Sequence, residues 1–142
     1  MKNLIFLFLL VLAAGMISCN ADDSNCVPET IHLNWTKDKT ILVEYNSEFQ
    51  RNDYNIVDGE NWLFEYNRSG AQCEDIFDDE WGEVLTFEID KNSDDFEFVD
   101  ENMLQTNCFY RQYGAWVRHN QYQIKDGMIK GEKKSANEWE IT

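Results

Sequence analysis

The sequence predicts an all-β fold, either an antiparallel β-sandwich or a small β-barrel of about eight short strands. In several short stretches apolar residues alternate with polar ones, which is the period-two pattern of half-buried strands. These stretches follow one another at short intervals, and no long stretch has the 3.6-residue period of a helix. Aromatic residues make up 14% of the chain and proline occurs once, so the chain can form a core despite its charge.

The clearest alternation lies between residues 31 and 89. Strands are expected at residues 31–35, 41–45, 54–57, 62–66 and 85–89. A turn at Lys37-Asp38-Lys39 is expected between the first two, and residues 47–60 are expected to be mostly loop, ending in a turn at Asp58-Gly59. Residues 73–82 lack this alternation, and a single helical turn is expected there.

The second half of the chain is expected to continue as strands and hairpins. A turn at residues 90–95 should lead into a strand containing Phe96 and Phe98. Asp126-Gly127 lies between two alternating segments and predicts a hairpin, because type I′ turns need positive φ angles. A second turn, at residues 133–137, should lead into a last strand at residues 138–141.

Residues 1–18 have the pattern of a secretory signal peptide. Lys2 precedes an apolar run at residues 4–11, and small residues follow at Ala13-Ala14-Gly15. The apolar run is much shorter than the ~20 residues that a membrane-spanning helix needs. We therefore expect this segment to be removed after export.

The next residues, Met16-Ile17-Ser18-Cys19, resemble the lipobox of bacterial lipoproteins. The resemblance implies that the Cys19 sulfur carries a diacylglycerol and that the chain is cut just before it. The acidic residues 20–25 look like the leader that sends some lipoproteins to the cell surface. The domains expected are a signal peptide (1–18), a lipidated flexible tether (19–28) and a single β domain (29–142).

This resemblance implies an outer-membrane protein, exposed at the cell surface, that contacts the membrane through its N-terminal lipid. Residues 13–15 also fit an ordinary signal-peptidase site. In that alternative the protein is secreted or periplasmic, and Cys19 is an ordinary cysteine.

Cysteines outside the cytoplasm tend to be oxidised. With Cys19 lipidated, we expect a Cys73–Cys108 disulfide, because both residues flank expected strands. Cys26 lies beside Pro28 in the tether and would be free or would replace one partner. Without lipidation two bridges could form, and their pairing is open.

The formal net charge of −15 argues against a nucleic-acid partner, because phosphates must be met by Lys and Arg. Anionic lipid headgroups would also repel this protein, so the lipid must hold it at the membrane. Acidic residues concentrate in residues 74–101 and basic residues in 109–134. These segments either pair with each other or form a docking dipole.

The sequence assigns no catalytic residue, because it lacks the nucleophile-elbow, phosphate-loop, HExxH and dinucleotide patterns. Asp90, Asn92 and Asp94 place oxygen ligands at alternate positions, which suggests a weak calcium site in a turn. Asp95 stands where an EF-hand needs glycine, so an EF-hand is rejected. A second acidic group has a similar potential for a cation: Asp75, Asp78, Asp79 and Glu80.

Most of the five tryptophans alternate with apolar residues and are expected in the core. Trp81 and Trp116 do not, and are expected to form an exposed binding surface. The chain is therefore expected to be a non-enzymatic binding or structural module for a protein or glycan ligand outside the cell. One alternative is an inhibitor of an incoming basic hydrolase, similar to lysozyme inhibitors by fold analogy. The other is an enzyme that uses the acidic patch.

Overall fold

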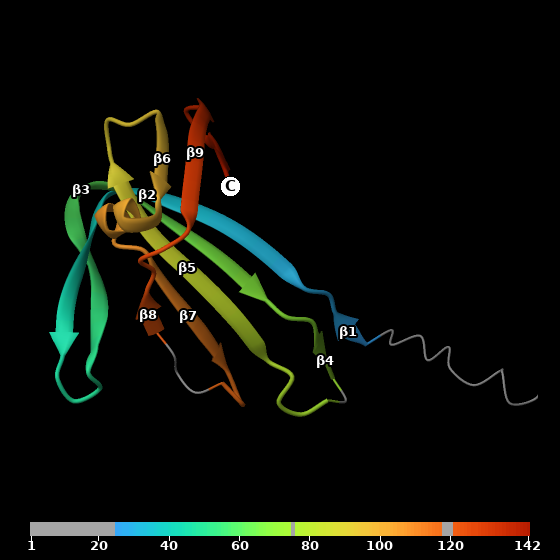
Figure 1. The fold of residues 1–142 in the computed structure, drawn as a ribbon. Helices are drawn as coiled ribbons and strands as arrows, with labels where there is room; N and C mark the ends of the chain where they lie inside the picture. Colours follow the sequence, from blue (N-terminus) through green and yellow to red (C-terminus); the bar gives the residue numbers. More distant parts are fainter. Residues whose placement is uncertain (1–24, 75, 118–120) are drawn as a thin grey trace, which may run out of the picture.

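The computed structural model describes residues 25–74, 76–117 and 121–142, and in these residues the fold is all-β. Figure 1 shows long strands crossing the molecule, with the short helix η1 beside them. The elements are β1 (Cys26–Val27), β2 (Thr30–Asn46), β3 (Arg51–Ser69), β4 (Gln72–Cys73), β5 (Trp81–Asp90), β6 (Asp95–Val99), the 3-10 helix η1 (Asp100–Thr106), β7 (Phe109–Gly114), β8 (Gln121–Gln123), β9 (Met128–Ser135) and β10 (Glu138–Ile141).

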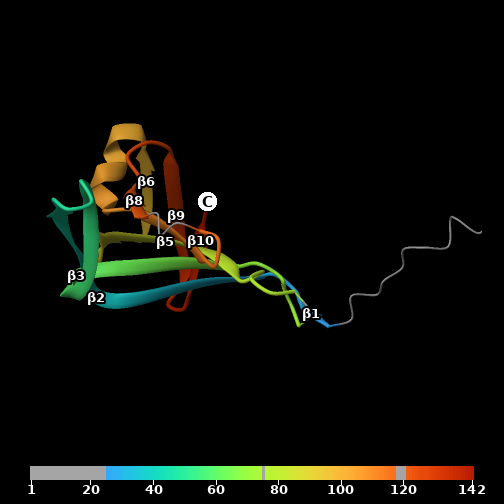
Figure 2. The same cartoon turned by 90° about the horizontal axis from the view of Figure 1, so that it is seen from below.

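These strands form three antiparallel sheets. The main sheet has the order β2-β3-β5-β7-β8, the small sheet has the order β10-β9-β6, and β1 pairs with β4. Figure 2 shows that the small sheet stands over one half of the main sheet and leaves the half nearer β1 without a second sheet. The main sheet does not close on itself, so of the two expected architectures the sandwich is the correct one.

The core lies between the main and small sheets and is rich in aromatic rings. It consists of Trp62, Phe64, Phe87, Ile89, Phe96, Met103, Cys108, Ile129 and Trp139. Phe64 stacks on Phe87 with ring centroids 5.0 Å apart and meets the edge of Trp139 at 5.2 Å. The expected inward set of β5 is confirmed, since Phe87 and Ile89 are buried and Leu85 packs against the same cluster.

Two expected turns are irregularities within long strands. The turns expected at 37–39 and at Asp58-Gly59 face each other across the β2–β3 ladder, where the register shifts and Lys39 pairs with both Asp58 and Asn61. Asp38 takes a left-handed φ of 56°, and a Cβ on Gly59 would lie 2.4 Å from Cβ of Thr40. Both predictions of a chain reversal are wrong, because the ribbon bends here and continues.

Beyond this bend, residues 40–57 of β2 and β3 form a hairpin that we call the arm. Its Ile41 packs with Leu63 and Phe109 on the second face of the main sheet. The Tyr54 ring lies 4.6 Å from that of Phe109, and the backbone N–H of Ile41 donates to a carboxylate oxygen of Glu88 (2.8 Å). Most of the residues expected to be loop at 47–60 therefore belong to a strand.

The hairpin expected at Asp126-Gly127 is also wrong. β8 pairs with β7 in the main sheet, whereas β9 pairs with β6 and β10 in the small sheet. Gly127 has a φ of 122°, but Asp126 is not in the left-handed region, so the segment is not a type I′ turn. It carries the chain from one sheet to the other, and its carbonyl at Gly127 accepts a bond from the backbone N–H of Asp100 (2.7 Å).

The other expected elements differ less. The turn at 90–95 and the strand that contains Phe96 and Phe98 are confirmed. This strand is β6, and it pairs with β9 and not with β5. The hairpin between β9 and β10 is confirmed. No helical turn occurs in the described part of residues 73–82, where the chain forms β4, turns and the start of β5.

The disulfide joins Cys26 to Cys73, so the expected Cys73–Cys108 pair is wrong. The β1–β4 ladder places Cys26 directly opposite Cys73, whereas Cys108 is a fully buried free thiol in the core. Cys26 is therefore not free; it takes the place of Cys108 in the expected bridge. The end of the expected tether, at residues 26–27, is thus bridged to the domain, while residues 1–24, including Cys19, lie outside the described residues.

The acidic and basic segments pair in part with each other. Lys130 lies 3.6 Å from Glu97, and Lys133 lies 3.2 Å from Asp94. Both contacts join β9 to β6 or to the turn before it, so part of the charge asymmetry is internal to the small sheet. None of the helices in the described ranges has the length and apolar character needed to cross a membrane.

Candidate binding surface

The uncovered half of the main sheet carries an aromatic surface that we call the shelf: Arg68, Trp81, Glu83, Tyr110 and Tyr122. Paired residues of an antiparallel ladder place their side chains on the same face. The row formed by Phe64 and Phe87 lies in the core under the small sheet. The next row contains the cross-strand neighbours Leu33, Tyr66, Leu85, Tyr110 and Tyr122. The shelf therefore continues the core face beyond the edge of its cover.

Arg68 is held at the centre of the shelf by two carboxylates. Its Nη2 donates to Oε2 of Glu29 (2.9 Å), and its Nη1 donates to Oε1 of Glu83 (3.3 Å). The guanidinium carbon also lies 5.3 Å from the ring centroid of Trp81, within range of a cation–π contact. The bonds to both carboxylates raise the pKa of Arg68, and its bond to Glu29 lowers the pKa of that carboxyl group.

Tyr110 links this charged group to the aromatic part of the shelf. Its hydroxyl donates to Oε2 of Glu83 at 2.6 Å, and its ring lies 5.3 Å from that of Tyr122. Burial, followed by the hydrogen bond and charge of Glu83, raises the pKa of Tyr110 to about 12. The phenol thus stays protonated at neutral pH, and both oxygens of Glu83 are occupied.

These contacts give the shelf a fixed shape and an amphipathic character. Trp81 and Tyr122 are partly exposed, with 37% and 45% of their surface open to solvent. Tyr, Trp and Arg are the residues most enriched at binding hot spots, because they combine a large apolar area with a polar end. The shelf can therefore stack on a flat apolar group and hydrogen-bond at its margins.

The structure brings the two predicted binding tryptophans to the same end of the sheet but in different settings. Trp81 pairs with Gly114, and Trp116 follows two residues later. Trp81 lies against Gly70 and Arg68, whereas Trp116 is 82% exposed. That these two residues bind a ligand stays a prediction.

Arg68, Tyr110 and Tyr122 were not among the residues predicted to form a binding surface. A signal for Arg68 was present, since the alternation of Trp62, Phe64 and Tyr66 continues to it and places a base on the apolar face. Tyr110 lies opposite Tyr122 because of the register between β7 and β8. The sequence did not predict this register, because it did not locate the connection between the two strands.

The predicted calcium residues are engaged in other contacts. Oδ1 of Asp90 accepts bonds from the backbone N–H (2.7 Å) and side-chain amide (2.9 Å) of Asn92, and Oδ1 of Asp94 accepts from Lys133 (3.2 Å). In the second acidic group, Asp79 accepts from the backbone N–H of Cys73 (2.6 Å), and Asp75 lies outside the described residues. In residues 25–74, 76–117 and 121–142, no three His, Cys, Asp or Glu side chains converge as a metal site would require. Calcium binding remains a prediction that no contact of these residues supports.

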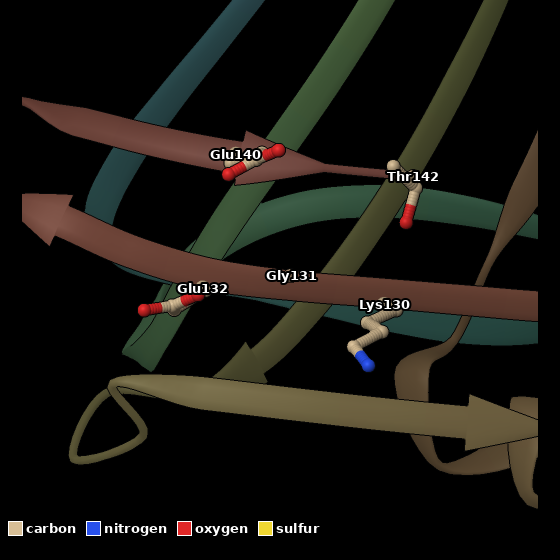
Figure 3. A pocket seen from close by; sticks show the side chains of 5 residues that line it. All are labelled: Lys130, Gly131, Glu132, Glu140 and Thr142. Carbon is tan, nitrogen blue, oxygen red and sulfur yellow. The ribbon is translucent and has the colours of Figure 1, made fainter.

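The small sheet carries a shallow hollow on the face turned away from the core. Figure 3 shows Lys130 and Thr142 at one end of this hollow and Glu132 and Glu140 at the other. Lys134 forms ion pairs with both glutamates, which raise its pKa. No aromatic residue is among the residues that line the hollow, so it offers a weaker candidate than the shelf.

Comparison of the chain with protein-family models, with curated proteins and with solved structures found no match.

Proposed function

We propose that this protein is a lipid-anchored, non-enzymatic binding module of a bacterial cell envelope, displayed at the outer membrane surface. Its shelf takes a protein or glycan ligand that is met outside the cell. The observation that carries this proposal is the half of the main sheet that the small sheet leaves uncovered (Figure 2). Its aromatic residues Trp81 and Tyr122 are partly exposed. An exposed patch of this kind on a soluble domain is typical of an interaction site.

The contacts within the shelf support binding more than catalysis. Both carboxylates, Glu29 and Glu83, already accept bonds from Arg68, and Glu83 also accepts from Tyr110. A general acid or nucleophile needs a carboxyl group that can reach the substrate. These carboxylates instead hold Arg68 in place for a ligand.

The lipid anchor is supported by the resemblance of residues 16–19 to a lipobox. Intact mass spectrometry of the mature protein tests it. The expected mass is that of residues 19–142 with acyl groups on Cys19 and one disulfide. A mature protein that begins elsewhere, or whose Cys19 is unmodified, would remove the anchor from the proposal.

The binding role is tested with a matched pair of tyrosine variants. Tyr122 lies on the shelf, and Tyr45, which is 67% exposed, lies on the arm. Extracellular proteins and immobilised glycans would be screened for binding to the purified protein. We expect Tyr122→Ser to weaken capture of the ligand by tenfold or more, and Tyr45→Ser to leave it unchanged.

Equal effects of the two variants would contradict a role for the shelf. The salt dependence of capture distinguishes binding through the aromatic shelf from the alternative role, inhibition of a basic hydrolase. Charge-driven binding is screened by salt, whereas an aromatic contact is much less affected. Capture of a basic enzyme that is lost at high salt would favour the inhibitor.

A further inference from the structure

A second exposed apolar group lies at the end of the main sheet nearest to the N-terminus. We call it the rim: Val27, Ile76, Phe77 and Trp116. Phe77 is 95% exposed and Trp116 is 82% exposed, while Val27 and Ile76 are each more than half exposed. An almost fully exposed phenylalanine and tryptophan contribute nothing to the core, so packing does not explain them.

The fold brings these four residues to one end although they come from three parts of the chain. Val27 belongs to β1, which pairs with β4, and Ile76 and Phe77 follow β4 within the connection to β5. Trp116 follows β7, whose last residue, Gly114, pairs with Trp81 at the start of β5. In both views of the fold, β1 and the connection from β4 to β5 lie together at this end (Figures 1 and 2).

Covalent geometry keeps this end close to Cys19. Cys26 is the seventh residue after Cys19, so their Cα atoms cannot be more than about 25 Å apart. The disulfide holds Cys26 at 4.0 Å from Cys73 between Cα atoms, and Phe77 is at most about 14 Å further along the chain. If Cys19 carries a lipid, the short tether keeps the rim within reach of the bilayer.

We propose that the rim docks onto the surface of a zwitterionic phospholipid bilayer, with the Phe77 and Trp116 rings at the level of the headgroups. The proposal rests on the lipid anchor of the proposed function. Aromatic rings prefer this interface, where their apolar faces leave water and the indole N–H keeps a polar partner. The anchor makes docking intramolecular, so a few side chains are sufficient to favour it.

The charge of the rim selects the kind of lipid. Phe77 lies among acidic residues of the same connection, namely Glu74, Asp78, Asp79 and Glu80. An anionic surface would repel these carboxylates, and a surface without net charge would not. Docking should therefore weaken as anionic lipid is added, and weaken most at low salt.

The test uses the mature protein reconstituted in phosphatidylcholine vesicles that contain brominated lipids, which quench nearby tryptophans. Subtracting the signal of Trp116→Phe isolates Trp116 from the other four tryptophans. We expect Trp116 to be quenched by at least half, and Phe77→Ser to reduce this quenching at least twofold. Phe49→Ser is the matched control, because Phe49 is 60% exposed at the tip of the arm, between β2 and β3, and it should change nothing.

Three results would overturn the proposal. The first is a Trp116 signal that brominated lipid leaves unchanged, and the second is equal loss of quenching in the Phe77 and Phe49 variants. The third is shielding of Trp116 that rises with the protein-to-lipid ratio, which would assign the rim to a second copy of the chain.

Failure of the native anchor is distinguishable from failure of docking. If the native protein proves unacylated, a maleimide lipid can be coupled to the Cys19 thiol of the mature chain. Cys26 and Cys73 are bridged and Cys108 is fully buried, so coupling is selective for Cys19. Quenching with this synthetic anchor would retain the rim as a membrane surface, and its absence would refute docking whichever anchor is present.

Discussion

Replacing Cys26 and Cys73 together by serine is expected to lower the free energy of unfolding by about 4 kcal/mol. The disulfide joins residues 47 apart in sequence, and the loop that it closes contains all of β2 and β3. In the chain-entropy model such a loop lies between the ~3 kcal/mol of a 15-residue loop and the ~4.7 kcal/mol of a 100-residue loop. The effect is a large part of the ~5–15 kcal/mol that stabilises a typical domain.

Serine is suitable because both cysteines are only partly buried, so the hydroxyl groups can reach water. Urea unfolding followed by tryptophan fluorescence measures the change for the double variant against the wild type. Cys108→Ala is the control, because it removes the free thiol and keeps the bridge. It should cost only about 1 kcal/mol, the cost of a small deletion in a core.

Two results would refute this reasoning. A peptide map under non-reducing conditions in which Cys73 is linked to Cys108 would contradict the bridge itself. A double serine variant within 0.5 kcal/mol of the wild type, with Cys108→Ala the more damaging change, would show that the bridge does not constrain the unfolded chain.

Three further predictions concern the core, the shelf and the arm. Phe64→Ala should lower stability by about 3–5 kcal/mol in urea, because Phe64 is fully buried among aromatic rings. Between about pH 10 and 12 the wild type should lose stability as pH rises, because Tyr110, with its pKa raised to about 12, stays protonated longer in the folded state. In urea titrations, Tyr110→Phe should make the fall in stability with rising pH less steep. An unchanged slope would assign this fall to Cys108, because burial raises the pKa of Cys108 to about 12. Glu88→Ala should cost about 1–3 kcal/mol, since the buried N–H of Ile41 loses its acceptor; a neutral variant would contradict this role.

Much of the strand content follows from local alternation. In β5 the residues Leu85, Phe87 and Ile89 face the same core that their spacing indicated. Where one face of a strand is buried, alternation shows which face of the sheet each side chain occupies. It does not report where a strand ends, because Asp38 and Gly59 read equally well as a turn or as a bend within one ribbon.

The shelf was located only in part. Trp81 was predicted to lie on an exposed binding surface because it stands among acidic residues. Arg68, Tyr110 and Tyr122 lie on the same face near it only because of the register of four strands. The surface also exists because the small sheet covers half of the main sheet, and no local pattern specifies how far that cover extends.

The sequence by itself determined an all-β chain, the inward set of β5 and the core position of Trp62 and Trp139, because these depend on period-two burial within single strands. Only the tertiary structure decided which strands pair, that Asp126-Gly127 connects two sheets, and that Cys73 bonds to Cys26. Pairing brings together residues far apart in the chain. It is selected by the burial of the whole core and by ladder register, neither of which a local stretch of sequence contains.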